Sequence, residues 1–323
     1  MKAIRIESTG GANVLELKDI DLPPPDDTQV RVQHTAIGIN FIDIYYRKGL
    51  YKAPLPSGLG MEAAGVVTAK GSKVTHLKEG DRVGYCSGPL GAYAQEANVP
   101  AERAVVIPAS IPDEIAAAVL LKGMTAQYLL KRTYPLKAGE TILFHAAAGG
   151  VGQIACQWAK HIGATVIGTV GNISKIAAAK SVGCDHVIVS KTEDIAKRVR
   201  EITGGKGVPV VYDSVGKDTV MASLDSLSVR GLFVTFGNAS GPIPPFEPAI
   251  LSQKGSLYMT RPTLFHYAIT KEELQETAND LFAVLASGAV RVARPTKYPL
   301  ADAARAHGDL ESRKTTGSLV LIP

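Results

Sequence analysis

The segment from residue 141 to residue 162 constrains the fold of this chain more than any other. It reads TILFHAAAGGVGQIACQWAKHI, an apolar strand that runs into a glycine turn and then into a helix. Apolar or small side chains recur along the helix at spacings of three and four: Val151, Ile154, Ala155, Trp158, Ala159 and Ile162. Strand, turn and amphipathic helix in this order predict a Rossmann unit that binds a dinucleotide.

The glycines have a physical role in such a unit. They permit a tight turn and a close approach of the backbone to a pyrophosphate, while the helix N-terminus supplies free N–H groups and a favourable dipole. We therefore assign Gly149, Gly150, Val151 and Gly152 to the pyrophosphate. Ala147 occupies the position of the first glycine of the motif in this chain.

The residues after the next predicted strand, 165–170, indicate which dinucleotide is preferred. Sites that prefer NAD carry an acid about twenty residues after the glycines, where it binds the ribose hydroxyls. This chain reads GNISK at 171–175, without an acid. NADPH is therefore the expected cofactor, with Ser174 and Lys175 as candidates to bind its 2′-phosphate. The alternative is that Lys175 is an ordinary surface lysine.

Two domains are expected, because 323 residues exceed the size at which one hydrophobic core stops growing. Residues before about 107 show short alternating runs with frequent turns, which indicate a β-rich domain with one short helix at 41–48. A helix start is expected near 111–114. Further strands are predicted at 141–146, 186–189, 208–213 and 231–236, separated by helical segments as in a parallel sheet.

The tail after about residue 262 offers a helix at 271–286, a strand at 296–299, a second helix and a last strand at 317–321. Patterning alone leaves two places open for this tail, the Rossmann sheet or the first domain.

Composition excludes several classes of protein. Hydrophobic residues make up 46% and charged residues 20%, which is typical of a compact globular chain and not of a disordered one. The net charge of +5 is scattered and forms no basic stripe, so nucleic-acid binding is not expected. Three dispersed cysteines and the absence of a membrane-spanning apolar run favour a cytoplasmic protein.

Four motifs add a family resemblance that covers nearly the whole chain. They are GINFID at 38–43 with Tyr45, Arg47, Gly49 and Tyr51; GLGMEAAG at 58–65; KGMT at 122–125; and the AAGGVG turn. With them the chain resembles the medium-chain dehydrogenase/reductase superfamily, specifically its quinone oxidoreductase branch, which includes bacterial enzymes and ζ-crystallin.

That resemblance implies an α/β fold made of a GroES-like catalytic domain and a Rossmann domain. The implied boundaries are 1–122 for the first part of the catalytic domain, 123–262 for the NADPH-binding domain and 263–323 for a return to the catalytic domain. It also implies a cofactor cleft between the domains and a homodimer, for which the strand near 256–259 is a candidate edge.

The resemblance also implies that the protein works without zinc. Zinc-dependent relatives have a cysteine ligand where this chain has Asn40 and a histidine where it has Met61. Three dispersed cysteines do not make a structural zinc site either. Glu62 is then expected to serve packing or hydrogen bonding.

The site residues follow from the resemblance position by position. It implies that the cofactor contacts include Asn40, Tyr45, Lys122, Thr125, Gly171, Ser174, Lys175, Ser190, Phe236, Gly237, Asn238, Thr260, Arg261 and Arg313. Ser190 departs from the pattern, since relatives often have an aromatic ring or imidazole there. Weaker binding of NADPH is therefore expected at that point. The catalytic candidates are Asn40, Asp43, Tyr45 and Tyr51.

Without zinc to polarise an alcohol, the expected acceptor is one that takes hydride readily, a quinone or a conjugated enone. Tyr45 and Tyr51 are expected to line its pocket, with Asn40 and Asp43 positioning them; the alternative is that all of them only pack or cap. Reduction of 2-alkenals, and a non-catalytic NADPH- and RNA-binding role, remain rival functions. The acceptor itself, and transfer of electrons singly or as hydride, stay open.

Overall fold

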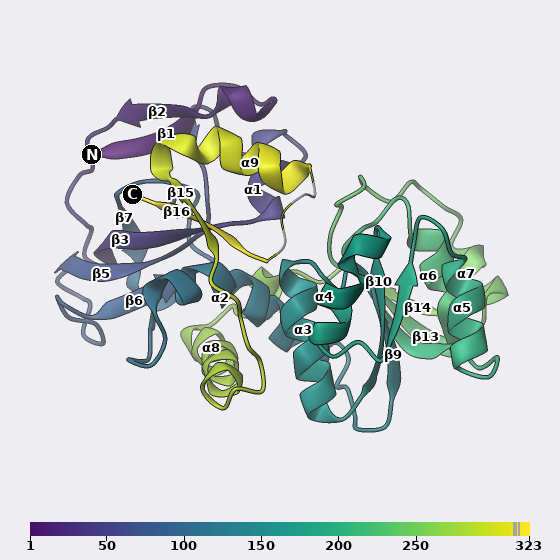
Figure 1. The fold of residues 1–323 in the computed structure, drawn as a ribbon. Coiled ribbons are helices and arrows are strands. Elements are labelled where there is room, and N and C mark those ends of the chain that lie inside the picture. The colour runs from purple at the N-terminus through teal and green to yellow at the C-terminus, as the bar shows by residue number, and fades with distance from the viewer. Residues whose placement is uncertain (313–314, 316) are drawn as a thin grey trace. The chain divides into compact units, whose positions relative to one another are not determined.

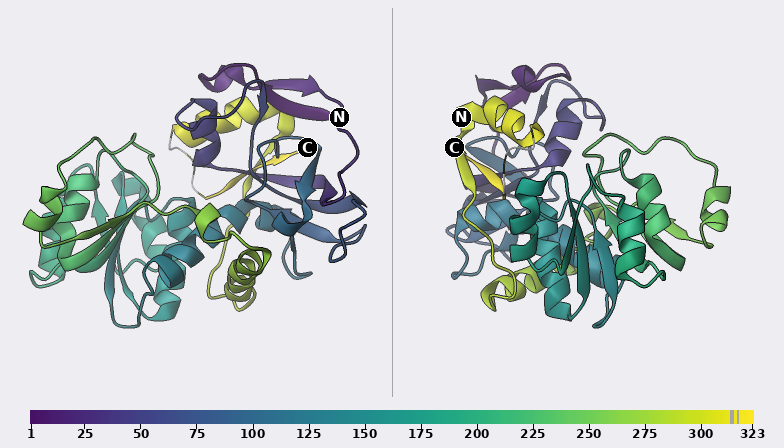
Figure 2. Two further views of the ribbon diagram at one scale, coloured as in Figure 1. Left: turned by 180° about the vertical axis from the view of Figure 1, so that it is seen from behind. Right: turned by 45° about the vertical axis from the view of Figure 1, so that its right-hand side comes forward.

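The computed structural model describes residues 1–312, 315 and 317–323, and these divide into two compact units. The first unit comprises Met1–Met124, Ala268–Ala286 and Val292–Pro323. The second comprises Thr125–Tyr267 and Ser287–Arg291. Both chain ends lie in the first unit (Figure 1, Figure 2). None of the helices in the described part of the chain is long and apolar enough to cross a membrane.

The first unit is built from two sheets. A seven-stranded sheet has the order β15-β16-β3-β5-β6-β8, with β7 also paired to β3, and a three-stranded sheet has the order β2-β1-β4. The strands of this unit are β1 (Lys2–Ile6), β2 (Glu16–Asp19), β3 (Gln29–Ile39), β4 (Ser57–Gly58), β5 (Glu62–Lys70), β6 (Arg82–Tyr85), β7 (Glu96–Pro100), β8 (Val105–Val106), β15 (Thr296–Pro299) and β16 (Leu319–Ile322). Its helices are α1 (Phe41–Arg47), α8 (Lys271–Ala286), α9 (Ala303–Glu311) and the first part of α2 (Asp113–Tyr128).

The C-terminal tail joins the sheet of the first unit. Strand β16 pairs antiparallel with β3, and β15 pairs parallel with β16. Figure 1 shows α9, in yellow, packed in the same unit as these two strands. The pairing places the tail at the strand that leads directly into α1.

Helix α1 begins where the sequence predicts and ends one residue earlier than predicted. Its start is held by Asp43, whose Oδ2 accepts from the backbone N–H of Asn40 at 2.8 Å. Its end is followed by Gly49, which adopts a positive φ of 76° that favours glycine. The helix therefore has defined ends although it is only seven residues long.

The second unit is a doubly wound sheet of six parallel strands in the order β11-β10-β9-β12-β13-β14. The strands are β9 (Thr141–Phe144), β10 (Thr165–Val170), β11 (His186–Val189), β12 (Val208–Asp213), β13 (Leu227–Thr235) and β14 (Tyr258–Thr260). The helices are α3 (Gly150–Ile162), α4 (Ile176–Ser181), α5 (Ile195–Ile202), α6 (Val220–Ser226) and α7 (Ala249–Gln253). Helices α3 and α4 cover one face of the sheet, and α5 and α6 cover the other (Figure 1). The predicted α/β architecture, a β-rich unit and a Rossmann sheet, is confirmed.

Strand β13 begins four residues before the predicted start at Gly231. Its register on β12 shifts between Val208 and Val210, and Arg230 within it has a positive φ of 59°. Residues 227–230 read LSVR, which alternates apolar and polar side chains, whereas the prediction covers only the more continuous apolar run GLFVTF that follows.

Candidate functional site

The glycine turn, residues 146–152, joins the end of β9 to the first turn of α3. Ala146 has a positive φ of 53°, a conformation strained for any residue with a Cβ atom. Its N–H donates to the Thr169 hydroxyl at 3.2 Å, and its carbonyl accepts from the N–H of Gly149 at 2.8 Å. The neighbouring strand β10 thus holds the turn in its strained shape.

Gly152 must be glycine for steric reasons. A Cβ atom there would lie 2.4 Å from the carbonyl oxygen of Ala146 and 2.7 Å from the Cα of Ala147. Within the described residues, no side chain caps the start of α3 at Gly149. The first N–H groups of this 13-residue helix have no partner inside the helix, so they are suited to an anion such as a pyrophosphate.

The end of β10 carries the residues predicted to bind the 2′-phosphate. Gly171 and Ser174 are exposed, and Lys175 is partly buried. Asn172 Oδ1 accepts from the N–H of Ser174 at 3.0 Å and so shapes this segment. The Ser190 hydroxyl donates to the carbonyl of Val170 at 3.2 Å, which places it beside the same strand end. No carboxylate occurs at 171–175.

The end of β13 carries a further group of predicted residues. Phe236 donates its N–H to the carbonyl of Asp213 at 2.8 Å. Arg261 Nη1 donates to the carbonyl of Gly237 at 2.9 Å, and the Asn238 amide oxygen accepts from Arg261 Nη2 at 3.0 Å when the amide is turned to suit its neighbours. Thr260, just before Arg261, is the last residue of β14.

These three groups lie at one edge of the sheet. The carboxyl ends of parallel strands meet at the same edge, and ligands bind where the strand order reverses. Here the order reverses between β9 and β12, beside the glycine turn. The second unit therefore offers a candidate dinucleotide site, for which the glycine turn, residues 171–175 and residues 236–238 are the predicted contacts.

The first unit buries a group of polar residues around Asn40. Asn40 Nδ2 donates to Glu62 Oε2 at 2.7 Å, and Lys122 Nζ lies 3.7 Å from the same oxygen. Leu121 donates its N–H to the other Glu62 oxygen at 2.7 Å. Burial raises the pKa of Glu62, although Lys122 opposes this. Glu62 is thus a hydrogen-bonding residue, as the sequence predicts.

Asp43 is completely buried. Its Oδ2 accepts from the N–H of Asn40 and from the Tyr93 hydroxyl at 2.9 Å. Tyr93 in turn lies 2.9 Å from His307 Nε2. Burial raises the pKa of Asp43 to about 7. The contacts show Asp43 bracing the start of α1 from inside the unit.

The structure brings the two predicted tyrosines together. Their rings pack edge to face with centroids 5.4 Å apart, and the N–H of Tyr51 donates to the carbonyl of Tyr45 at 3.2 Å. Both are partly exposed. Tyr46 also packs edge to face on Tyr51, at 5.6 Å. The sequence analysis did not identify the packing partners Tyr46, Tyr93 and His307, because no motif marks them. Arg313 lies outside the described residues.

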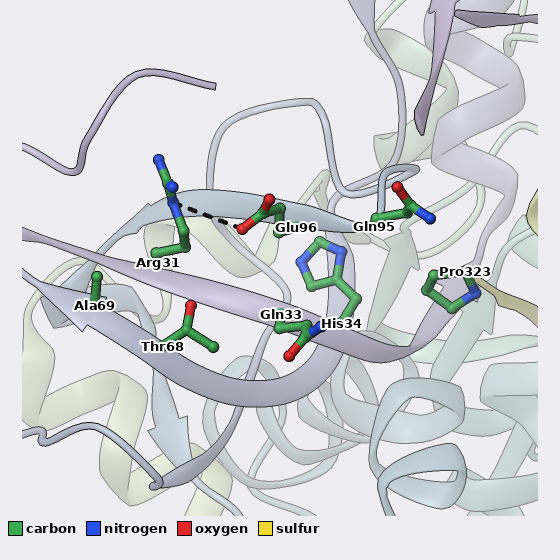
Figure 3. Close-up of a pocket in the computed structure, with 8 residues that line it drawn as sticks. All are labelled: Arg31, Gln33, His34, Thr68, Ala69, Gln95, Glu96 and Pro323. Atoms are coloured by element: carbon green, nitrogen blue, oxygen red, sulfur yellow. Dashed lines mark ion pairs between the residues drawn. The ribbon is translucent and has the colours of Figure 1, made fainter. Parts of the chain in front are cut away.

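A hollow of about 580 Å³ lies elsewhere on the first unit, over β3, β5 and β7 (Figure 3). In it Arg31 pairs with Glu96 at 3.7 Å, and both ring nitrogens of His34 have partners. Its lining residues are Arg31, Gln33, His34, Thr68, Ala69, Gln95, Glu96 and Pro323. It contains none of the predicted site residues.

The two positions that the resemblance assigns to zinc ligands in zinc-dependent enzymes carry Asn40 and Met61 here, and both are buried. Among the described residues, no three His, Cys, Asp or Glu side chains lie close enough together to hold a metal ion.

We therefore predict that the purified protein carries no stoichiometric zinc, because amide and thioether groups are poor replacements for imidazole and thiolate ligands. Elemental analysis of the purified protein checks this. A tightly held stoichiometric zinc, whose removal by a chelator abolishes activity, would contradict it.

Comparison with known proteins gives two family models and several full-length relatives. Residues 26–109 match the alcohol dehydrogenase GroES-like domain, and residues 150–284 match the zinc-binding dehydrogenase domain. The chain is 55% identical over 323 residues to a quinone oxidoreductase of Pseudomonas aeruginosa, covering 100% of this chain and 99% of the relative. It is 45% identical to a 2-haloacrylate reductase of a Burkholderia species, covering 98% of each.

The fold agrees equally well with a solved structure. The crystal structure of Escherichia coli quinone oxidoreductase complexed with NADPH superposes with a TM-score of 0.98 at 53% identity, covering 100% of both chains. The likeness therefore extends over both units and not only over the glycine turn.

Proposed function

Because the chain belongs to the zinc-free quinone oxidoreductase branch of the medium-chain dehydrogenase/reductase superfamily, we propose that it reduces quinones with NADPH. The observation that carries this proposal is the close packing of Gly152 on the glycine turn, in a chain that matches quinone oxidoreductases from end to end. A glycine at this position lets the helix pack closely on the turn, which directs the free N–H groups at the helix N-terminus toward a pyrophosphate.

The proposed cofactor is NADPH, which supplies the reducing equivalents when bound. The residues of the second unit that we assign to it are Thr125, Gly149, Gly150, Val151, Gly152, Gly171, Ser174, Lys175, Ser190, Phe236, Gly237, Asn238, Thr260 and Arg261. Asn40, Tyr45 and Lys122 of the first unit are proposed contacts as well. The assignment of the 2′-phosphate to this region is supported by the segment after β10, which contains no acid and carries the exposed Ser174 and the partly buried Lys175.

The protein's own residues are proposed to bind and orient an apolar, flat acceptor more than to supply a strong acid or base. Tyr45 and Tyr51 form the partly exposed aromatic face for it. Asn40 and Asp43 are proposed to position the two tyrosines, since the hydrogen bond from the Asn40 N–H to the Asp43 carboxylate fixes the start of the helix that carries Tyr45. Burial of Asp43 keeps it from direct contact with an acceptor.

Tyr51→Phe and Tyr45→Phe are expected to lower kcat/KM for the acceptor by at most about tenfold, because each removes one hydroxyl and keeps the ring. The dissociation constant for NADPH should change much less. Steady-state kinetics with fluorescence titration of NADPH measures both. Tyr46→Phe, on the neighbouring ring, is the matched control. Unchanged kinetics in both variants with every active acceptor would make these tyrosines packing residues.

Reduction of a carbon–carbon double bond is a second candidate, favoured by the 45% identity to a 2-haloacrylate reductase. NADPH oxidation with a panel of quinones, 2-alkenals and 2-haloacrylates distinguishes the two. Our proposal predicts the highest kcat/KM with a quinone. A higher value with an alkenal or haloacrylate and little activity with quinones would favour the second candidate.

The proposed location is the cytoplasm, because Cys86, Cys156 and Cys184 are buried free thiols, which suits a reducing compartment.

The proposed assembly is a homodimer through the sheet of the second unit. Within the described part of the chain, strand β14 is the edge strand of this sheet and pairs only with β13. Tyr258 on this edge is 62% exposed, and Val229 on β13 is 72% exposed. An apolar edge strand is a natural surface for pairing with a second copy.

Tyr258→Lys is expected to weaken self-association by at least about tenfold, since it places an unpaired charge in the proposed interface. Sedimentation velocity over a concentration series measures this. Ile269→Lys, which replaces an equally exposed apolar residue in the first unit, is the control and should remain dimeric. A wild type that is monomeric at all concentrations, or a Tyr258→Lys variant as dimeric as the control, would contradict the proposed edge.

A further inference from the structure

A buried chain of polar side chains lies directly behind the glycine turn in the second unit. His145, the residue before the turn, is completely buried. Its Nδ1 lies 3.1 Å from the Thr169 hydroxyl, and its Nε2 lies 3.0 Å from the Ser223 hydroxyl. Ser223 donates to Asp213 Oδ2 at 2.8 Å. The chain joins the residue that follows β9 to residues of β10, β12 and α6.

The directions of these hydrogen bonds can be assigned from the number of protons. Ser223 has one hydroxyl proton and gives it to Asp213, so it must accept from Nε2–H of His145. In neutral His145 the other nitrogen, Nδ1, then accepts the hydroxyl proton of Thr169. The Thr169 oxygen keeps a lone pair for the N–H of Ala146. Burial lowers the pKa of His145, against the opposing effect of Asp213, which favours the neutral ring.

The far end of the chain is anchored to a second part of the dinucleotide site. Asp213 Oδ1 accepts from the N–H groups of Val215 and Gly216 at 2.7 and 3.0 Å. Thr219 donates its hydroxyl to Asp213 Oδ2 at 2.7 Å. The carbonyl of Asp213 accepts from the N–H of Phe236, one of the proposed cofactor residues. Every member between Ala146 and Asp213 therefore has its partners.

We propose that Thr169, His145, Ser223 and Asp213 are positioning residues that hold the glycine turn in its pyrophosphate-binding shape and fix it relative to residues 236–238. The inference rests on the proposed function, because it assumes that the turn binds a dinucleotide. It adds to that function a set of residues that do not contact the cofactor but determine how tightly the cofactor binds. Since the pyrophosphate is common to NADPH and NADH, the chain should affect both cofactors equally.

The central test is Thr169→Val, which removes the hydroxyl and keeps the branched shape. We expect the dissociation constants of NADPH and NADH to rise by the same factor, about three- to tenfold. The KM for NADPH should rise with them, and kcat should change less than about twofold. Thr169→Ser, which restores the hydroxyl, should recover most of the wild-type affinity. Thr165→Val, at the amino end of the same strand, is the control for the substitution itself.

A merely structural role would lower the thermal stability of Thr169→Val and leave the affinity of the folded protein unchanged. Dissociation constants within twofold of the Thr165→Val control would overturn the proposal, as would a Thr169→Ser variant no better than Thr169→Val. If Thr169→Val does not fold, Ser223→Ala tests the chain from its other end with the same expected rise for both cofactors. An isotope-labelled imidazole of His145 should show a protonated Nε2 in the wild type, and the opposite tautomer would contradict the assigned directions.

Failure of the proposed function looks different. A folded wild type that binds neither NADPH nor NADH contradicts dinucleotide binding itself, and it is recognised before any variant is made. A wild type that binds both, with variants that bind as well as it does, overturns only the positioning role.

Discussion

Gly152→Ala is expected to weaken the binding of both NADPH and NADH by about a hundredfold or more. The added Cβ would lie 2.4 Å from the carbonyl oxygen of Ala146 and 2.7 Å from the Cα of Ala147. Both are backbone atoms that cannot swing aside, so the turn or the first turn of α3 must move. Loss of two charge-assisted hydrogen bonds to a pyrophosphate, at about 1.5 to 3 kcal/mol each, gives an effect of this size.

A control makes the Gly152→Ala result interpretable. Gly308→Ala, in α9 of the first unit, meets no atom within 4 Å and should leave cofactor binding unchanged. Isothermal titration with each cofactor, alongside a thermal melt of each variant, measures these effects. A folded Gly152→Ala variant with wild-type dissociation constants would show that the cofactor does not rest on this turn.

Lys175→Ala is expected to weaken NADPH binding by about ten- to a hundredfold and to leave NADH nearly unchanged. Lys175 lies at the end of the segment after β10, where no acid repels a 2′-phosphate. A charge-assisted hydrogen bond from its ammonium contributes about 1.5 to 3 kcal/mol, and only NADPH has the phosphate that accepts it. Rising ionic strength should reduce the NADPH preference of the wild type, and that of the variant much less.

Lys180→Ala is the matched control for this prediction, since Lys180 is an exposed lysine further along in α4. It should bind both cofactors as the wild type does. Equal dissociation constants for NADPH in wild type and Lys175→Ala would assign the phosphate to Ser174 or to backbone N–H groups instead. The contrast with Gly152→Ala is informative, because that change should affect both cofactors and this one only NADPH.

Much of the fold could be predicted because its signals are local. The strands 165–170, 186–189 and 208–213, and the helix 271–286, have the predicted bounds. Each is a run whose apolar period or turn residues can be read without knowledge of its neighbours. Patterning did not decide the place of the C-terminal tail, which only the family resemblance assigned to the first domain, because that place depends on the pairing of β16 with β3, which is far away in the sequence.

The candidate site was also predicted from local signals, and its residues remain predictions. The glycine turn carries its own sequence pattern, and so does the missing acid after β10. The surroundings of Asp43 carry none, since Tyr93 reaches it from a distant segment of the chain and is itself bonded to His307 from another. The chain from Thr169 to Asp213 is likewise assembled from residues in four separate segments of the sequence. Such networks become visible only when the fold brings the elements together.

A single-turnover experiment tests the central claim, that this chain transfers reducing equivalents from bound NADPH to a quinone without zinc. Chelator-treated, metal-free protein is loaded with one equivalent of NADPH and mixed with an excess of a simple quinone. Absorbance of the reduced nicotinamide follows the reaction. We expect the rate constant for this loss of absorbance to be at least as large as the steady-state kcat. The Gly152→Ala variant should not oxidise NADPH under the same conditions. Bound NADPH that stays reduced in the presence of every quinone tried, or activity that returns only when zinc is added, would contradict it.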